Sequence, residues 1–166
     1  PIPGIELDHV VTSDELFLLR EMPKSLLIIG GGVISVEFAS VYADLGCQVT
    51  IVEALPRIVP NMDKEISQNL KMILKKRGVE IITGAKVQNI VLNGELLSCN
   101  IMEKEKEQSV EAEYILSAVG RCPNTEGLFA DTVEIEMERG RVVVNADFET
   151  SIPGVYAIGD LIFGAQ

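Results

Sequence analysis

The residues whose types and spacing could do chemistry lie between positions 30 and 53. Three consecutive glycines, Gly30 to Gly32, follow an apolar run, and the small residue Ser35 comes shortly after them. Glycine lets a chain turn sharply, and without a Cβ at Gly32 a phosphate group could approach the backbone closely. Backbone N–H groups at the start of a following helix would then face that anion. Glu53, after a second apolar run, could accept hydrogen bonds from sugar hydroxyls.

Two strands and a helix must position these groups. Residues 25–29 and 48–52 predict apolar parallel strands, and residues 33–45 predict the helix between them. This order is that of a dinucleotide-binding unit, with Gly30, Gly32 and Ser35 at the pyrophosphate and Glu53 at the adenosine ribose. Since Glu53 would repel a 2′-phosphate, the sequence favours NAD(H) over NADP(H). The alternative is a glycine turn that merely joins a strand to a helix in another α/β protein.

Composition narrows the class of protein further. The chain has 166 residues and a formal net charge of −11, which suits one domain and argues against nucleic acid or an anionic membrane as a partner. No apolar run approaches the ~20 residues that span a bilayer. Cys47, Cys99 and Cys122 form neither a CxxC nor a metal-ligand pattern. We therefore expect buried or half-buried thiols, no metal site and a cytoplasmic location.

The rest of the chain departs from simple strand–helix alternation. Residues 1–24 predict a linker, with a solvated His9, and a short helix. A helix capped by Asn61 or Asp63 and a strand at 79–83 follow the glycine unit. Antiparallel strands are then expected at 85–92, 95–102 and 109–112, and further strands at 114–119, 141–144 and 155–158. The predicted fold class is α/β, a Rossmann-like parallel sheet with helices and an inserted three-stranded antiparallel meander.

Two later segments carry a family resemblance. Residues 118–125 read AVGRCPNT, and residues 150–160 read TSIPGVYAIGD. Together with the glycine turn, they resemble the pyridine nucleotide–disulfide oxidoreductase family over nearly the whole chain. Residues 53–65 are most similar to its dihydrolipoamide dehydrogenase branch.

The resemblance implies roles for further residues. Ile34 matches an apolar residue near the nicotinamide, and Glu37 an acid that reaches its ribose or carboxamide. Gly120 matches backbone near the nicotinamide, and Glu53 with its neighbour Ala54 matches the adenosine end. Glu37 could instead be an ordinary acid on the helix surface.

Two more residues are matched at the edges of the site. Val87 falls where the family packs an apolar residue on adenine, although it could be a plain strand residue. Asp160 matches an acid that hydrogen-bonds the ribityl and phosphate region of FAD, and it could also cap a helix. Arg57, four residues beyond Glu53, leaves room for an NADPH preference.

The resemblance also implies missing parts. The family has a redox cysteine pair in an FAD domain and a His–Glu base in a dimerisation domain, and this sequence contains neither. The chain therefore resembles an excised central NAD-binding domain at residues 25–145, with the meander at about 85–112. Residues 146–166 would begin the return to the FAD-binding domain. No catalytic residue is expected within the chain.

The expected parent enzyme oxidises dihydrolipoamide with NAD+ and carries FAD. Its partners would be NAD(H), a flavin and a dithiol substrate reached through the missing domains. The resemblance also implies a homodimer and a place in a 2-oxo acid dehydrogenase complex. Two alternatives stay open: a sister NADH-dependent flavoprotein, such as an NADH oxidase or a transhydrogenase, and a stand-alone module that senses NAD.

Overall fold

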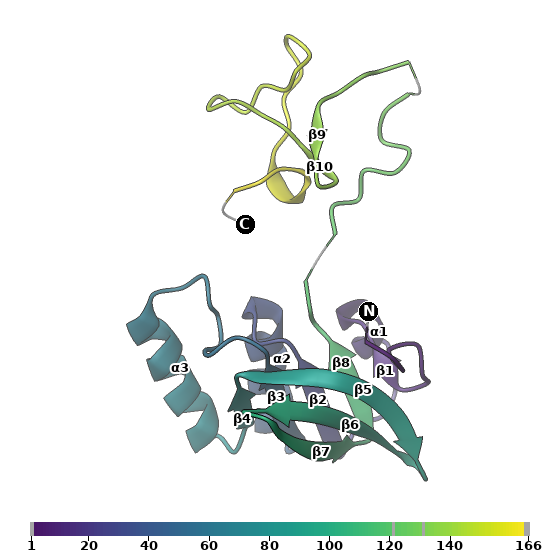
Figure 1. The fold of residues 1–166 in the computed structure, drawn as a ribbon, viewed down its shortest axis with the longest axis vertical. Coiled ribbons are helices and arrows are strands. Elements are labelled where there is room, and N and C mark those ends of the chain that lie inside the picture. Colours follow the sequence, from purple (N-terminus) through teal and green to yellow (C-terminus); the bar gives the residue numbers. More distant parts are fainter. Residues whose placement is uncertain (1, 121, 131, 165–166) are drawn as a thin grey trace. The chain divides into compact units, whose positions relative to one another are not determined.

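The computed structural model describes residues 2–120, 122–130 and 132–164. The chain forms two compact units, one that ends at Gly120 and one that follows it (Figure 1). The first unit contains a five-stranded sheet, a three-stranded sheet and the three α-helices of the described residues. The predicted nucleotide-binding domain ends at residue 145, which lies within the second unit. This functional boundary stays a prediction.

A parallel sheet forms the centre of the first unit. Its strand order is β1-β8-β2-β3-β4, and β2 pairs with β3 on one side and β8 on the other. In β2, the four residues from Leu26 to Ile29 are buried, as expected for a strand covered on both faces. The strand bounds are Val10–Val11 for β1, Ser25–Ile29 for β2, Gln48–Glu53 for β3, Glu80–Thr83 for β4 and Tyr114–Ser117 for β8.

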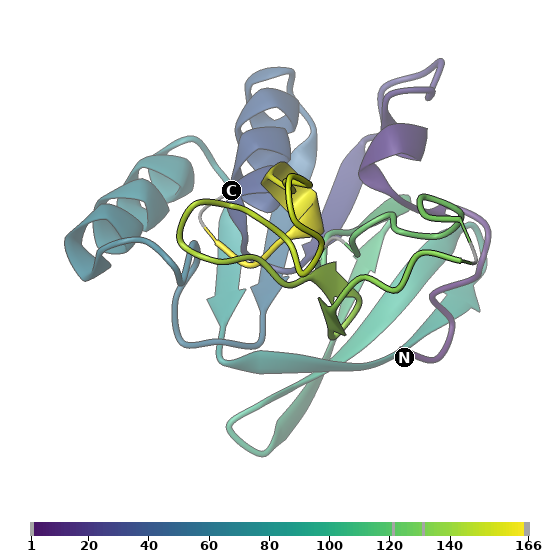
Figure 2. The same cartoon turned by 90° about the horizontal axis from the view of Figure 1, so that it is seen from above.

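Helices cover one face of this sheet and the meander covers the other (Figures 1 and 2). The helices are α1 (Ser13–Leu16), α2 (Val33–Asp44) and α3 (Lys64–Lys76). Alternate residues of β2 serve the two layers, since Ile28 packs in the cluster that contains Ala39 of α2, whereas Leu27 packs in the cluster that contains Ile101 of the meander. Within the described residues, no helix has the length and apolar character needed to cross a membrane.

The meander consists of β5 (Ala85–Asn93), β6 (Leu96–Glu103) and β7 (Lys106–Ala112), all antiparallel. The Asn93-Gly94 pair predicts a hairpin here, and the structure has one. Asn93 ends β5 and pairs with Leu96, so the turn lies at Gly94 and Glu95. The register shifts between Val87 and Asn89, so β5 contains a bulge there. The result is three layers, helices on a parallel sheet on a meander, and the predicted fold class is confirmed.

Some local expectations were wrong. The segment read as a linker contributes β1, whose Val10 pairs with Ile115 at the sheet edge; two residues are too few to show a periodicity. His9 is exposed, as expected, and its ring also stacks on Tyr114, with ring centroids 4.5 Å apart. β7 starts at Lys106 rather than Ser109. Its first two residues are charged and solvent-exposed, so they gave no strand signal in the sequence.

The second unit differs from expectation as well. Its regular elements are β9 (Met137–Glu138), β10 (Arg141–Val142) and the short 3-10 helix η1 (Gly159–Leu161). The strand expected at 155–158 is reduced to an isolated bridge between Glu149 and Tyr156. Cys47 and Cys99 are buried as expected, but Cys122 is exposed.

Candidate functional site

A pocket of about 460 Å³ opens at the carboxyl edge of the parallel sheet. The glycine turn after β2, the tip of β3, the start of β5 and the segment after β8 form its walls. Ligands of open α/β sheets bind outside the carboxyl ends of the strands, as this pocket does. It brings together these predicted site residues: Gly30, Gly32, Glu53, Ala54, Val87 and Gly120.

The three glycines of the turn differ in what surrounds them. Gly30 has a φ of +102°, and an added Cβ would lie 2.5 Å from the carbonyl oxygen of Ala118. A Cβ on Gly31 would lie 2.9 Å from Oε2 of Glu53. Gly32, in contrast, has an ordinary φ of −75°, and its added Cβ would meet no described atom within 4 Å. Folding therefore explains Gly30 and Gly31, whereas Gly32 leaves a space at the pocket wall that a Cβ would fill.

The start of α2 offers backbone donors beside that space. Gly32 is its N-cap and supplies no side-chain hydrogen bond, and the first turn contains no acidic residue. The first N–H groups of a helix have no partner within the helix, and the helix dipole makes this end electropositive. An anionic group lying over Gly32 would therefore meet both the donors and the favourable field.

Glu53 joins two walls of the pocket. The residue is only 8% exposed. Oε2 accepts the N–H of Gly31, and Oε1 accepts the N–H of Leu55 at 2.6 Å. Because an ionised carboxylate can accept about four hydrogen bonds, both oxygens keep capacity for a ligand hydroxyl. The sequence predicted a ligand-facing role for Glu53, which stays a prediction, and gave no sign of this structural role.

Four predicted residues do not line this pocket. Ser35 is fully buried in the first turn of α2, and its Oγ has no hydrogen-bond partner among the described residues. Ile34 is half-buried and Glu37 is exposed. Asp160 lies in the second unit, within η1, where its backbone carbonyl accepts a hydrogen bond from Arg141 at 2.8 Å.

Other residues of the pocket were not foreseen. Lys86 on β5 lines it, next to the predicted Val87, and residues of the loop after β3 also contribute: Leu55, Pro60 and Asn61. The signal for Lys86 was available, because the strand after Gly84 brings its first residues to the same sheet edge as Glu53. The loop residues gave no periodic signal.

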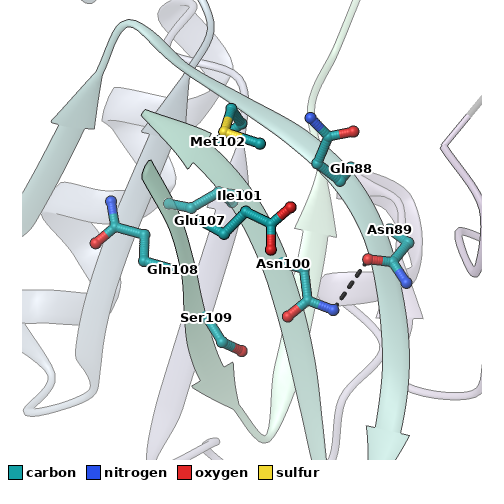
Figure 3. A pocket seen from close by; sticks show the side chains of 8 residues that line it. All are labelled: Gln88, Asn89, Asn100, Ile101, Met102, Glu107, Gln108 and Ser109. Carbon is teal, nitrogen blue, oxygen red and sulfur yellow. Dashed lines mark hydrogen bonds between the residues drawn. The ribbon is translucent and has the colours of Figure 1, made fainter. Parts of the chain in front are cut away.

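A second hollow, of about 530 Å³, lies over the meander. Figure 3 shows that its lining is rich in amide side chains, and Asn100 Nδ2 donates to Asn89 Oδ1 at 3.0 Å. None of its lining residues comes from the glycine turn or the tip of β3. It therefore adds nothing to the site at the carboxyl edge.

Comparison with known proteins gives relatives along the whole chain. Dihydrolipoamide dehydrogenase of Chaetomium thermophilum is 42% identical over 99% of this chain and 34% of its own length. Dihydrolipoyl dehydrogenase of Bacillus subtilis is 40% identical over 99% of this chain and 36% of its own length. The chain thus spans about a third of the length of these relatives.

Solved structures share the fold. The HOCl-induced flavoprotein disulfide reductase RclA of Escherichia coli matches with a TM-score of 0.85 and 36% identity, over 100% of this chain and 38% of its own. LpdA of Mycobacterium tuberculosis matches with a TM-score of 0.81 and 28% identity, over 93% of this chain and 33% of its own. The family model described as pyridine nucleotide-disulphide oxidoreductase matches residues 1–166. The chain belongs to the pyridine nucleotide-disulphide oxidoreductase family.

Proposed function

We propose that this chain is the NAD(H)-binding part of a flavoprotein and that the nucleotide occupies the pocket at the carboxyl edge of the sheet. The observation that carries the proposal is Gly32, whose missing Cβ leaves space that no described atom fills. A diphosphate placed there would meet the uncapped start of α2. Glu53 would accept hydrogen bonds from the adenosine ribose, and Val87 would contact the adenine.

Charge favours NAD(H) over NADP(H) in this arrangement. The buried carboxylate of Glu53 would repel a 2′-phosphate at the ribose. Arg57, the cation nearest to Glu53 in sequence, donates from Nη2 to the carbonyl of Pro60 at 2.8 Å and does not line the pocket. Among the described residues that line the pocket, the cation is Lys86. It lies on β5 next to Val87, the residue proposed to contact the adenine.

For the full-length protein we propose dihydrolipoamide oxidation with NAD+, on the basis of relatives at about 40% identity. The bound nicotinamide would supply the hydride-accepting chemistry. This chain would contribute affinity and orientation: the glycine turn fixes the diphosphate, Glu53 fixes the ribose, and Gly120 borders the nicotinamide end. Ile34 and Glu37 at that end, Asp160 as an FAD contact, the homodimer and the place in a 2-oxo acid dehydrogenase complex stay predictions from the resemblance.

A second candidate is a disulfide reductase of another substrate. The likeness to RclA, whose printed description is a flavoprotein disulfide reductase, supports it at 36% identity. Both candidates share the nucleotide pocket, so the pocket itself does not separate them. An assay of the full-length protein with dihydrolipoamide and NAD+ would separate the two candidates, because only the first predicts NADH formation.

Titration with NADH and NADPH, followed by fluorescence of the reduced nicotinamide, tests the binding proposal directly on this chain. We expect saturable NADH binding, weaker NADPH binding and loss of both in a Gly32→Val variant that keeps its circular dichroism spectrum. Lys76→Ala, a substitution at the end of α3 outside the described pocket lining, serves as the control and should leave the NADH affinity unchanged. NADH binding that is equally tight in Gly32→Val would remove the pocket from consideration.

A further inference from the structure

The loop after β3 contains a backbone conformation that its sequence disfavours. Val59 has a φ of +39°, in the left-handed region, and is 4% exposed. A β-branched residue adopts this conformation rarely, because its side chain crowds the backbone. Such a residue persists only where its surroundings impose the conformation, and these positions cluster at functional sites.

In this conformation, Val59 forms a hydrogen bond to the glycine turn. Its N–H donates to the carbonyl of Gly31 at 2.6 Å. The N–H of Gly31 donates to Glu53, at the end of β3. Both polar groups of Gly31 are therefore bound by residues on either side of one loop, residues 54–58. The turn that precedes α2 is thus fixed by a segment that follows β3.

Helix α3 in turn holds the loop. Ser67 is 2% exposed, and its Oγ donates to the carbonyl of Ile58 at 2.8 Å. Ile58 is itself fully buried in the helix-side core. The peptide that joins Ile58 to Val59 is therefore bound to α3 through its carbonyl and to the glycine turn through its N–H.

We propose that Val59 and Ser67 are positioning residues of the nucleotide site. Ser67 orients the peptide between Ile58 and Val59, and that peptide fixes the carbonyl of Gly31, so the N–H groups at the start of α2 face the pocket before a ligand arrives. The benefit for affinity is preorganisation, since the turn need not be ordered on binding. The effect on affinity rests on the proposed function, whereas the effect on the turn does not.

The test compares Ser67→Ala with Ser98→Ala in the full chain. Ser98 is a matched control, because it is 8% exposed, its Oγ lies 2.6 Å from Oγ of Ser109, and it belongs to the meander rather than to the pocket lining. Amide hydrogen exchange of peptides covering residues 30–36 is measured without ligand, and the NADH dissociation constant is measured separately. Loss of one hydrogen bond corresponds to roughly a 3- to 10-fold change in a local equilibrium.

For Ser67→Ala we expect exchange across residues 30–36 to accelerate by about that factor and the NADH dissociation constant to rise similarly. Ser98→Ala should change neither, and Ser67→Thr, which keeps a hydroxyl, should restore part of the protection. Val59→Pro provides a second route, because proline has no N–H and cannot adopt a positive φ, so it removes the bond to the Gly31 carbonyl without touching Ser67; it should also accelerate exchange in the turn.

The two proposals can fail separately. Unchanged exchange in the turn for both Ser67→Ala and Val59→Pro would overturn the positioning role, whatever the affinity does. Accelerated exchange in Ser67→Ala, together with a wild-type chain that does not bind NADH, would support the coupling of loop and turn and would overturn the nucleotide assignment instead. Accelerated exchange with an unchanged NADH dissociation constant would overturn the claim that the coupling serves binding.

Discussion

Glu53 and Gly31 are in direct contact at the pocket wall. The carboxylate Oε2 accepts the Gly31 N–H, and a Cβ on Gly31 would lie 2.9 Å from the same oxygen. The acid and the glycine therefore require each other: only a residue without a side chain fits, and only an acceptor satisfies its N–H. The group proposed to select the nucleotide is also part of the turn's structure.

We expect Glu53→Gln to reduce stability even without a nucleotide. A glutamine offers one acceptor oxygen and one amide NH₂, so it can satisfy the N–H of Gly31 or that of Leu55 but not both. Leaving a buried donor unsatisfied costs about 1–3 kcal/mol in the free energy of unfolding. Urea denaturation measures this change. Glu111→Gln, at an exposed acid that accepts from Asn93, is the control and should change it by less than about 0.5 kcal/mol.

Glu53→Arg should lose NADH affinity and gain affinity for NADPH. A guanidinium would attract the 2′-phosphate that the carboxylate repels. Because this variant also removes both acceptors, its absolute affinities will fall with its stability. The ratio of the two dissociation constants, measured by fluorescence titration at a temperature where the variant is folded, is the informative quantity. A ratio equal to that of the wild type would show that Glu53 does not contact the ribose.

Gly30→Ala and Gly32→Ala should have opposite effects on folding and binding. At Gly30, the φ of +102° and the 2.5 Å approach to the Ala118 carbonyl predict a loss of several kcal/mol in the free energy of unfolding. At Gly32, we expect a change within about 1 kcal/mol, since Ala is only a poorer N-cap than Gly, together with weaker NADH binding. Thermal denaturation and NADH titration of the two variants measure these effects. Equal loss of stability in both would show that the space beside Gly32 is occupied in solution.

The parts of the fold that followed from sequence have strong periodicity or specific turn chemistry. The buried run of β2, the glycine turn and a hairpin turn near Asn93 were predicted. A cap of α3 by Asn61 or Asp63 was also predicted, and the cap is Asp63. A parallel strand buried on both faces is uniformly apolar, and a cap has a specific residue type. These signals are local, so the sequence displays them directly.

The parts that sequence reasoning missed depend on contacts between distant segments. β1 is too short for a pattern, and its strand character comes from pairing with β8. The contact from Val59 to Gly31 joins two loops across the sheet edge, and a valine with positive φ contradicts its own local preference. Local rules fail most often where tertiary structure imposes a conformation, and here that place is the candidate site.

The three cysteines should differ sharply in reactivity. Burial raises the pKa of the Cys47 and Cys99 thiols to about 11 each, with the charge of Glu113 contributing at Cys47, whereas Cys122 is exposed. A disulfide reagent at pH 8 should therefore modify Cys122 rapidly and the other two only after denaturation, and Cys122→Ser should abolish the rapid phase.

As pH rises from 9 towards 11, the unfolded chain loses thiol protons that the folded chain retains, so stability should fall in this window. Rapid native reaction of Cys99 would contradict its burial.

Ser35→Ala should make the protein more stable. The Ser35 hydroxyl is fully buried, and its oxygen has no partner in the described part of the chain, so its removal ends a desolvation cost, and alanine is the better helix former. We expect a gain of about 1 kcal/mol in the free energy of unfolding, measured by urea denaturation. Ser40→Ala on the same helix is the matched control, because Ser40 Oγ accepts from Arg77 at 2.8 Å, and it should bring no gain.

If Ser35→Ala destabilises the protein instead, the hydroxyl has a partner in solution, such as a buried water. With NADH affinity unchanged in Ser35→Ala, the requirement at this position is for a small side chain under the turn rather than for a hydroxyl.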